Sequence, residues 1–360
     1  MQWCRGGRAA CPCVSGDDLP IPGPATRERH MRRAVFRRHG SPQDVLEIVE
    51  EDDPLPGPGQ VRVRNHVMTI NPADLLSIEG RYGTEPISLP ATPGVGACGL
   101  VDAVGEDVKR LKPGDRVLPV GGGLWADIVI LPERMAPPAP AGADPEQAAM
   151  MRANPGTAYL LLTGMADLAP GDWVVQNAAN SNVGRMVIRF AREMGFHTAN
   201  IVRRHEVAAV LRGDGADAVI VDDGNTDVTE AVTQAAGATP RIAFDAVGGE
   251  ATAALSGAVA PHGTVVVYGL LSGQDSVVGA RDLVFRDVSV RGFWLADWYR
   301  RASPEDMGRL HAFLERKLLD GVIHSPVEAR YDLGRIREAV AHAGRGGRNG
   351  KIILTGGLHA

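Results

Sequence analysis

The segment from Trp173 to Arg204 constrains the fold of this chain more than any other. It opens with a short apolar run, passes through a tight turn of small and polar residues, and continues with apolar residues at helical spacing. Gly195 follows the last apolar position and predicts the end of that helix, and residues 198–202 form a second strand-like run. We therefore expect a strand–helix–strand unit, which is the building block of a parallel α/β sheet.

The turn between the first strand and the helix has the spacing of a dinucleotide-binding fingerprint. Its pattern, Ala179-x-x-Asn182-x-Gly184, is similar to the A-x-x-G-x-G variant, in which small residues let a pyrophosphate approach N–H groups at a helix N-terminus. Asn182 stands where that variant has glycine. Because asparagine tolerates a left-handed backbone better than other non-glycine residues, we expect the turn to survive. The alternative is a strand–helix–strand unit that binds nothing.

The residues after the second strand indicate which dinucleotide would bind. This position usually carries an acid for the ribose hydroxyls of NADH, or an arginine for the 2′-phosphate of NADPH. Here it holds Arg203 and Arg204, with no acid before Glu206. A guanidinium can hold a phosphate through two parallel hydrogen bonds, whereas a carboxylate would repel it. We therefore expect NADPH, and the alternative is a pair of solvated surface arginines.

Length and composition limit the classes of function. A chain of 360 residues exceeds the size at which single cores keep growing, so we expect two domains. A net charge of −5 gives no general attraction to nucleic acid or to an anionic membrane surface, and no apolar run reaches a spanning length.

Residues 31–153 consist mostly of short strands separated by turns, which predicts a partly open β-barrel. The alternating strands and helices after residue 154 predict a doubly wound parallel sheet.

The first thirty residues differ from the rest of the chain. They hold Cys4, Cys11 and Cys13 but lack the apolar stretch of a secretory signal, so we expect residues 1–30 to be a disordered arm. Only Cys98 lies in the patterned part of the chain, so a disulfide framework is not expected and a reducing, cytoplasmic location fits. Cys11 and Cys13 could ligate a metal, but two thiols without a second pair of ligands make a metal site in the arm improbable.

With these parts assembled, the chain resembles the medium-chain dehydrogenase/reductase superfamily, most closely its zinc-independent 2-enoyl thioester reductases of the mitochondrial trans-2-enoyl-CoA reductase type. The resemblance covers essentially everything from Met31 onward. It is carried by short motifs: Asn71-Pro-Ala-Asp74, Gly80-Arg-Tyr82-Gly83, Asn154-Pro-Gly-Thr157, Gln176-Asn-Ala-Ala-Asn-Ser181, Val247-Gly-Gly249, Tyr268-Gly269 and Arg291-Gly-Phe-Trp294-Leu.

The resemblance implies a GroES-like catalytic domain over residues 31–153 and 297–360, a Rossmann domain over residues 154–296, and a homodimer joined through the Rossmann sheets. It also implies NADPH-dependent reduction of the C=C bond of a 2-enoyl thioester of coenzyme A or acyl-carrier protein, within fatty acid metabolism. Hydride would go to Cβ and a proton to Cα.

The resemblance also assigns site residues. Tyr82 is the expected proton donor, and Asn71 is a polar neighbour in the catalytic cleft. The expected cofactor-binding residues are Asn154, Thr157, Asn180, Ser181, Asn182, Val183, Gly184, Arg203, Arg204, Val247, Tyr268, Gly269, Phe293, Trp294 and Lys351. On spacing alone, Tyr82 could instead be a turn tyrosine, and Phe293 and Trp294 could be core aromatics.

No metal is expected. In zinc alcohol dehydrogenases of this fold, a cysteine and a Gly-His-Glu motif supply catalytic ligands, and the matching positions here are Asn71 and Gly94-Val95-Gly96.

Two other functions stay open. One is a zinc-free NADPH quinone or enone oxidoreductase, and the other is a non-catalytic NADPH-binding protein that retains the fold.

Overall fold

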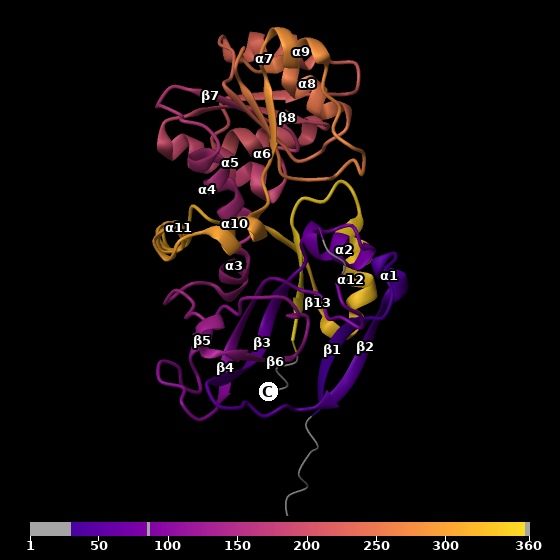
Figure 1. Ribbon diagram of the computed structural model, residues 1–360, viewed down its shortest axis with the longest axis vertical. Helices are drawn as coiled ribbons and strands as arrows, with labels where there is room; N and C mark the ends of the chain where they lie inside the picture. Colours follow the sequence, from indigo (N-terminus) through magenta and orange to yellow (C-terminus); the bar gives the residue numbers. More distant parts are fainter. Residues whose placement is uncertain (1–29, 85–86, 357–360) are drawn as a thin grey trace, which may run out of the picture.

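The structure, a computed structural model, describes residues 30–84 and 87–356, so the arm predicted for residues 1–30 lies outside the described residues except for His30. The chain forms two bodies, each built on a sheet, with helices α10 (Leu295–Arg301) and α11 (Pro304–Leu319) between them (Figure 1). Within the described ranges, no helix is both long and apolar enough to cross a membrane. The predicted α/β fold class, a GroES-like barrel with a Rossmann sheet, is confirmed.

The upper sheet has six parallel strands in the order β12-β11-β10-β7-β8-β9. Val174, Val175 and Phe244 are fully buried in it, as expected of strands covered on both faces. The strand order reverses between β7 and β10, and nucleotides bind outside the carboxyl ends of the strands at such a point. The strands are β7 (Trp173–Gln176), β8 (His197–Val202), β9 (Ala218–Val221), β10 (Ile242–Asp245), β11 (Thr264–Val267) and β12 (Ser289–Gly292).

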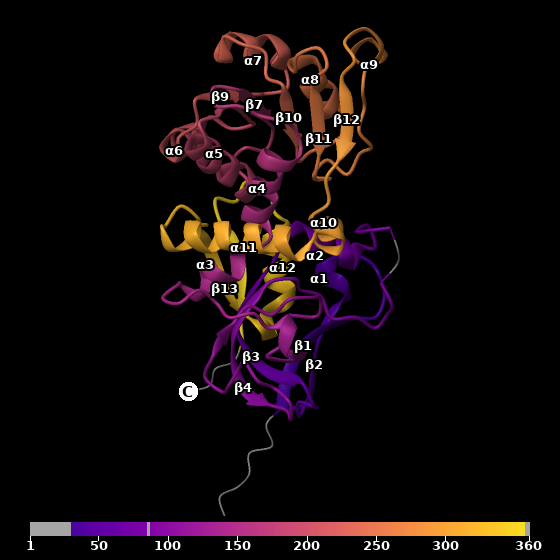
Figure 2. The same ribbon diagram turned by 60° about the vertical axis from the view of Figure 1, so that its left-hand side comes forward.

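Helices flank this sheet (Figure 2). Helix α5 buries Met186, Val187 and Phe190 completely, and it ends at Gly195 in the left-handed conformation that the sequence predicts. The helices of this body are α4 (Asn154–Gly164), α5 (Asn182–Met194), η2 (His205–Val207), α6 (Ala208–Asp214), α7 (Val228–Ala236), α8 (Glu250–Ala258) and α9 (Ala280–Phe285).

The lower body is built on a sheet of order β13-β14-β3-β4-β5, with β6 paired to β3. Strand β3 is central, because it pairs antiparallel with β4, β6 and β14. The last two strands of the chain, β13 and β14, therefore belong to the lower body, which also contains the first described residues. The strands are β1 (His30–Phe36), β2 (Leu46–Asp52), β3 (Gln60–Thr69), β4 (Ala97–Val104), β5 (Arg116–Val117), β6 (Ile128–Pro132), β13 (Val327–Asp332) and β14 (Lys351–Thr355).

Strands β1 and β2 form a separate antiparallel pair beside this sheet. Trp125, fully buried, fills the centre of the lower core, and its indole N–H donates to Thr69 O at 2.9 Å. The helices of the lower body are α1 (Pro42–Val45), α2 (Pro72–Glu79), η1 (Glu133–Met135), α3 (Pro145–Met150), η3 (Leu333–Arg335) and α12 (Ile336–Gly344).

One apolar cluster joins the two bodies. It contains Val67 and Cys98 of the lower sheet together with Val174 of the upper sheet and Phe190 of α5. Helix α11 contributes its buried face to this cluster, namely Leu310, Leu314 and Leu318. Because packed interiors deform little, this shared core fixes the two sheets relative to each other.

Two local predictions were wrong. The strand expected over residues 288–295 ends at Gly292, and Trp294 instead caps helix α10, because Leu295 turns into the shared core. The left-handed residue of the nucleotide turn is Ala178, with φ of 44°, and not Asn182. Asn182 is the first residue of α5, because Ser181 already caps that helix.

Gly184 allows α5 to approach the turn that precedes it. A Cβ at this position would lie 2.5 Å from Ala179 O, so we expect Gly184→Ala to lower the free energy of unfolding by about 1 to 3 kcal/mol. Gly164→Ala in α4 is the matched control, since nothing lies within 4 Å of its Cβ position. That change should leave stability unchanged or raise it slightly. Urea unfolding measures both, and an equal response would contradict the role of close packing.

Candidate active site

The predicted dinucleotide turn lies at the carboxyl edge of the parallel sheet, between β7 and α5. Ser181 Oγ accepts a hydrogen bond from the Gly184 N–H at 3.1 Å, and Gln176 Nε2 donates to Gly184 O at 2.9 Å. Asn180 precedes this cap and Val183 lies in the first turn of the helix. The helix N-terminus offers N–H groups and the positive end of a dipole, which suits a pyrophosphate.

Two polar groups beside this turn are shielded from solvent and lack a hydrogen-bond partner. They are Asn182 Nδ2 and the Tyr268 hydroxyl, which approaches Ser181 without forming a hydrogen bond of standard geometry. Burial raises the pKa of Tyr268, so this phenol keeps its proton. Buried polar groups without partners are costly, so their presence indicates a place for a polar ligand. A dinucleotide phosphate or ribose fits this requirement.

Residues after the next two strands lie at the same edge. Val247 follows β10, and Tyr268 and Gly269 follow β11, so the parallel register brings them beside the turn after β7. Gly269 is required there, because a Cβ would lie 2.5 Å from Ala246 O. The Asp245 carboxylate accepts a hydrogen bond from the Val247 N–H at 2.8 Å, so this acid holds the loop in place.

The two arginines expected at the 2′-phosphate follow β8. Arg203 is exposed, while Arg204 is half-buried and donates from Nη2 to Asn349 Oδ1 at 3.4 Å. Asn349 belongs to the loop before β14, in the lower body. The Asn349 N–H in turn donates to Glu328 Oε2 at 2.7 Å. The end of β8 therefore faces a loop that the sequence analysis did not include in the site.

Tyr82 and Trp294 connect the two bodies. Trp294 Nε1 donates to the Tyr82 hydroxyl at 2.7 Å, and the rings pack edge to face with centroids 5.6 Å apart. Burial raises the pKa of Tyr82, and the hydrogen bond from Trp294 opposes part of that rise. The phenol therefore stays protonated at neutral pH. The neighbouring Phe293 is buried in the shared core.

Asn71 sits at the N-terminus of α2 with only 6% of its surface exposed. Its Oδ1 accepts a hydrogen bond from Lys351 Nζ at 2.7 Å. Its Nδ2 donates to Thr69 Oγ1 at 3.0 Å, and its backbone N–H donates to Asp74 Oδ2 at 2.7 Å. Asn154 Nδ2, at the start of α4, lies 3.5 Å from the same Oδ1. The amide of Asn71 is thus fixed by contacts from several elements.

Asp74 and Lys351 are a buried acid and base around Asn71. Burial raises the pKa of Asp74 to about 7, and hydrogen bonds from Asn71 and the nearby Lys351 charge oppose that rise. Burial lowers the pKa of Lys351 to about 8, and Asp74 opposes that shift. Sequence reasoning missed Asp74 as part of the site. Its only signal was the spacing of an acid three residues after Asn71, which also describes an ordinary helix cap.

Thr157 differs from the other expected cofactor residues, because its hydroxyl already has a partner inside α4. Thr157 Oγ1 donates to Ala153 O at 2.9 Å. Lys351 is likewise occupied, since its Nζ also donates to Ile70 O at 2.9 Å. The structure therefore places Lys351 directly against Asn71, on the lower body.

The residues at the zinc-ligand positions of this fold do not fit a metal. Asn71 Oδ1 faces the Lys351 ammonium, which would repel a cation. The histidine and glutamate of the zinc motif are replaced by Val95, whose side chain has no donor atom, and by Gly96, where a Cβ would lie 2.5 Å from Thr69 Oγ1. Burial raises the pKa of the Cys98 thiol to about 11, the opposite of a metal-binding thiolate. Within residues 30–84 and 87–356, no three His, Cys, Asp or Glu side chains gather where they could hold a metal ion.

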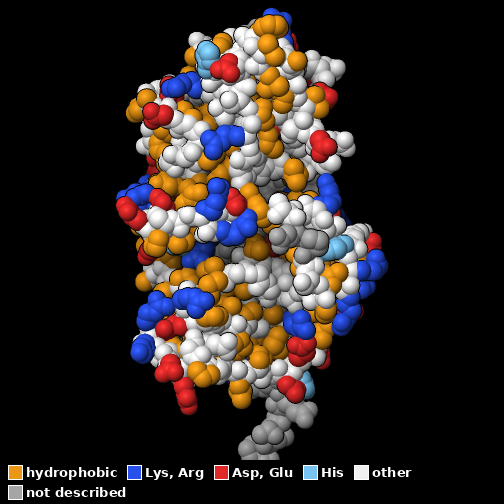
Figure 3. Space-filling model, viewed as in Figure 1, with side chains coloured by type: hydrophobic (Ala, Val, Ile, Leu, Met, Phe, Trp, Pro, Cys, Tyr) orange, Lys and Arg blue, Asp and Glu red, His pale blue; other side chains and the backbone are white. Residues whose placement is uncertain are grey.

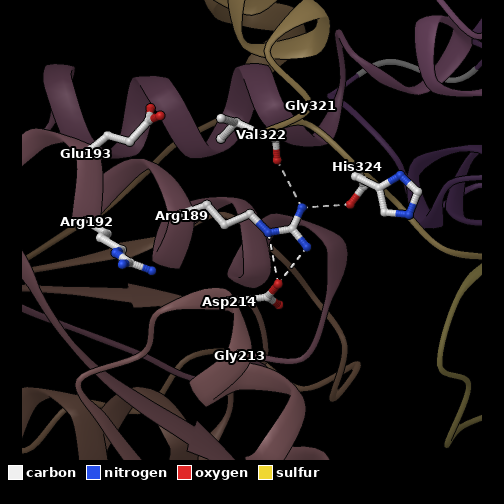
Figure 4. A pocket seen from close by; sticks show the side chains of 8 residues that line it. All are labelled: Arg189, Arg192, Glu193, Gly213, Asp214, Gly321, Val322 and His324. Carbon is white, nitrogen blue, oxygen red and sulfur yellow. Dashed lines mark hydrogen bonds and ion pairs between the residues drawn. The ribbon is translucent and has the colours of Figure 1, made fainter.

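A separate surface hollow of about 460 Å³ lies between α5, α6 and the segment after α11 (Figure 4). Its central side chain, Arg189, bonds the Asp214 carboxylate and the carbonyls of Val322 and His324. All three nitrogens of the Arg189 guanidinium donate to groups of the protein itself. This hollow is therefore a structural junction and not the reaction site.

Two family descriptions match the chain. The alcohol dehydrogenase GroES-like domain matches residues 57–141, and the zinc-binding dehydrogenase matches residues 182–315. The chain is 33% identical over 345 residues to the mitochondrial enoyl-acyl-carrier-protein reductase of Rattus norvegicus, covering 94% of this chain and 90% of that protein. It is 33% identical over 336 residues to the protein of the same name from Homo sapiens, covering 90% and 88%.

Solved structures share the fold along nearly the whole chain. A putative NADPH:quinone reductase from Bacillus thuringiensis is 29% identical with a TM-score of 0.84, covering 91% of this chain and 99% of its own. The Escherichia coli quinone oxidoreductase complexed with NADPH is 25% identical with a TM-score of 0.79, covering 90% and 99%. The Etr1p/Etr2p heterodimer of the mitochondrial 2-enoyl thioester reductase from Candida tropicalis is 24% identical with a TM-score of 0.79, covering 91% and 100%.

The prediction of a cytoplasmic location is wrong on these comparisons. It rested on the scarcity of cysteines in the patterned chain, which indicates a reducing compartment without identifying which one. The matched enoyl reductases from Rattus norvegicus, Homo sapiens and Arabidopsis thaliana are all named mitochondrial, and they point to that compartment instead.

The buried carboxyl of Asp74 should give the protein a pH-dependent stability. The folded state keeps this proton up to a pKa of about 7, whereas the ordinary value is 3.8, so the free energy of unfolding should fall as the pH rises between these values. Asp74→Asn cannot ionise and should lose this slope. Urea unfolding across this pH range checks it, with the exposed Asp275→Asn as control. A slope that survives in Asp74→Asn would contradict the assignment.

Proposed function

We infer the activity from one premise: the chain belongs to the medium-chain dehydrogenase/reductase superfamily and, within it, to the enoyl thioester reductases. It is an oxidoreductase that uses NADPH to reduce the C=C bond of a trans-2-enoyl thioester. The observation that carries the residue assignments is the hydrogen bond between Trp294 and Tyr82, which joins the two bodies at the site.

The direction of that hydrogen bond leaves a proton for catalysis. An indole N–H can only donate, so Trp294 must donate to the Tyr82 oxygen, and the phenolic hydrogen stays available. When bound, NADPH supplies hydride to Cβ of the enoyl group. Tyr82 then donates a proton to Cα or a hydrogen bond to the enolate oxygen, and the Trp294 N–H stabilises the charge left on the phenol oxygen.

Asn71 shapes the polar wall of the same cleft. We assign Lys351 and Thr69 to holding its side-chain amide in one orientation, since each makes a direct hydrogen bond to that amide. Asp74 instead fixes the backbone of Asn71 by accepting its N–H. A site held by surrounding contacts loses less entropy when the substrate binds. The reaction needs no Lewis acid in this arrangement, because hydrogen bonds can stabilise the enolate, and the residues at the metal positions do not fit zinc.

The cofactor would be held by residues gathered at the carboxyl edge of the upper sheet. The N-terminus of α5 would take the pyrophosphate, and Arg203 with Arg204 would take the 2′-phosphate. The remaining cofactor residues that we propose are Asn154, Thr157, Asn180, Ser181, Asn182, Val183, Gly184, Val247, Tyr268, Gly269, Phe293, Trp294 and Lys351.

The domain boundaries and the dimer belong to the same proposal. Residues 31–153 and 297–360 would form the catalytic domain, and residues 154–296 the cofactor domain. Strand β12 is the edge of the upper sheet, and the nearby α9 exposes Leu283, Val284 and Phe285, the last with 83% of its surface accessible. Such an edge and apolar patch suit a homodimer joined through the upper sheets, and the Candida tropicalis relative is a heterodimer.

A zinc-free quinone or enone reductase is the second candidate. The specific observation in its favour is the high structural similarity to the putative NADPH:quinone reductase, with a TM-score of 0.84. NADPH oxidation separates the candidates when trans-2-enoyl thioesters of increasing chain length are compared with a small quinone. Reduction of the quinone alone would overturn the thioester assignment, and turnover of neither substrate with intact NADPH binding would indicate a non-catalytic protein.

Tyr82→Phe removes only the phenolic hydroxyl. If Tyr82 donates the proton, kcat on enoyl thioesters should fall by roughly 10²- to 10⁴-fold, with NADPH affinity nearly unchanged. Tyr159→Phe is the matched control, because the Tyr159 ring packs on Phe313 in the core. Full turnover in Tyr82→Phe would mean that another group supplies the proton.

Arg203→Ala should weaken NADPH far more than NADH. A charge-assisted hydrogen bond to phosphate contributes about 1.5 to 3 kcal/mol, and NADH lacks that phosphate. Dissociation constants for both cofactors measure the effect, with exposed Arg212→Ala on α6 as control. Equal losses for NADPH and NADH would exclude a 2′-phosphate contact at Arg203.

A further inference from the structure

Arg152 is a guanidinium without a counter-ion in the described part of the chain. It lies between α3 and α4 and is half-buried. Its Nε is shielded from solvent and has no hydrogen-bond partner. No ion pair to a described carboxylate forms around it, although most other half-buried arginines, such as Arg32 and Arg189, are paired with aspartate. The sequence analysis did not single out this residue.

The groups around Arg152 come from the two helices that lie between the bodies. The Arg152 charge acts on Tyr299 of α10 and on His311 of α11, and the Tyr299 hydroxyl and His311 Nε2 are 3.5 Å apart. Burial and the Arg152 charge together lower the pKa of His311 to about 4, so this imidazole is neutral at neutral pH. Burial raises the pKa of Tyr299, against the effect of Arg152, so the phenol is neutral too.

This set of side chains is suited to an anion. Arginine stays charged in proteins, and a buried charge without a partner is costly. A guanidinium binds two oxygens of a carboxylate or phosphate through paired hydrogen bonds. The contact between Tyr299 and His311 uses one hydrogen, which leaves that pair one further O–H or N–H to donate. The cluster therefore offers several donors and one positive charge to an oxyanion.

The cluster borders the reaction site through two chain connections. Arg152 precedes Asn154 by two positions, and the Asn154 side chain reaches Asn71. Tyr299 is on α10, which starts directly after Trp294, the partner of Tyr82. Helices α10 and α11 lie at the boundary of the two bodies (Figure 2), and both basic and acidic side chains lie at that level of the surface (Figure 3).

We propose that Arg152, Tyr299 and His311 form an oxyanion-binding subsite for the substrate. The inference rests on the proposed enoyl thioester reductase function and narrows its substrate class to thioesters that carry a negatively charged group. The shared chemistry is an oxyanion, which comes either from the phosphate of a pantetheine arm or from a carboxylate on the acyl chain.

Arg152→Met removes the charge and retains an unbranched apolar stem. We expect this change to raise KM about 10- to 100-fold for the thioester whose oxyanion binds, with kcat little changed, and Arg152→Lys should recover part of the loss. Crotonyl-4′-phosphopantetheine compared with crotonyl-pantetheine tests the phosphate. Crotonyl-N-acetylcysteamine compared with an analogue that bears a terminal carboxylate tests the acyl chain. Arg309→Met on α11 is the matched control, because Arg309 is exposed and paired with Glu305.

The outcomes separate this proposal from the function on which it rests. Enoyl thioester turnover by the unmodified protein, with the same KM change in Arg152→Met for charged and uncharged substrates, would overturn the subsite and leave the function standing. Turnover of no enoyl thioester by the unmodified protein would overturn the function and, with it, the substrate role of Arg152.

A binding measurement tests the subsite without catalysis. Inorganic phosphate should raise the His311 pKa in an NMR titration of labelled histidine, because an anion offsets the Arg152 charge. Arg152→Met should abolish this response while circular dichroism shows an unchanged fold. A His311 pKa that phosphate does not move in the unmodified protein would overturn oxyanion binding at this cluster.

Discussion

The apolar core shared by the two bodies is the constraint on which the site depends. Valine and cysteine side chains of the lower sheet pack in one cluster with Val174, Phe190 and the buried face of α11. The two halves of the proposed site come from different bodies: Tyr82 and Asn71 from the lower one, the nucleotide turn and Trp294 from the upper one. Because the shared core sets the orientation of the sheets, it also sets the 2.7 Å hydrogen bond between Trp294 and Tyr82.

Buried polar groups then give the cleft its chemistry. Asp74 and Lys351 are almost fully enclosed, and burial moves the pKa values of both groups toward neutral pH, to about 7 and about 8. Burying an acid and a base lowers stability, so we relate their retention to Asn71. Lys351 holds the side-chain amide of Asn71, and Asp74 holds its backbone N–H. Arg152 is the converse case, because its partly buried charge has no counter-ion within residues 30–84 and 87–356. The substrate is therefore where we look for the anion.

The conclusion that the site does not fit zinc depends on the same residues around Asn71. One matched family is described as a zinc-binding dehydrogenase, yet Asn71 faces an ammonium, and Val95 and Gly96 stand where the zinc enzymes have histidine and glutamate. The scaffold is therefore shared with metal enzymes, while the residues that would hold the ion are replaced by a hydrogen-bonding network. Function in this fold follows the residues of the site more closely than it follows the architecture.

The sequence by itself determined the elements with strong periodicity and the residues that follow strand ends. The amphipathic pattern of α5 and its stop at Gly195 follow from local spacing. Ser181, Val247 and Gly269 are assigned to the site by family resemblance. Resemblance supplied Tyr82. Spacing could not show that Ala178 takes the left-handed conformation, that Leu295 starts a helix, or that Asp74, Lys351 and Arg152 are buried. These features depend on contacts between residues far apart in the chain, and only the tertiary structure decides which of those contacts form.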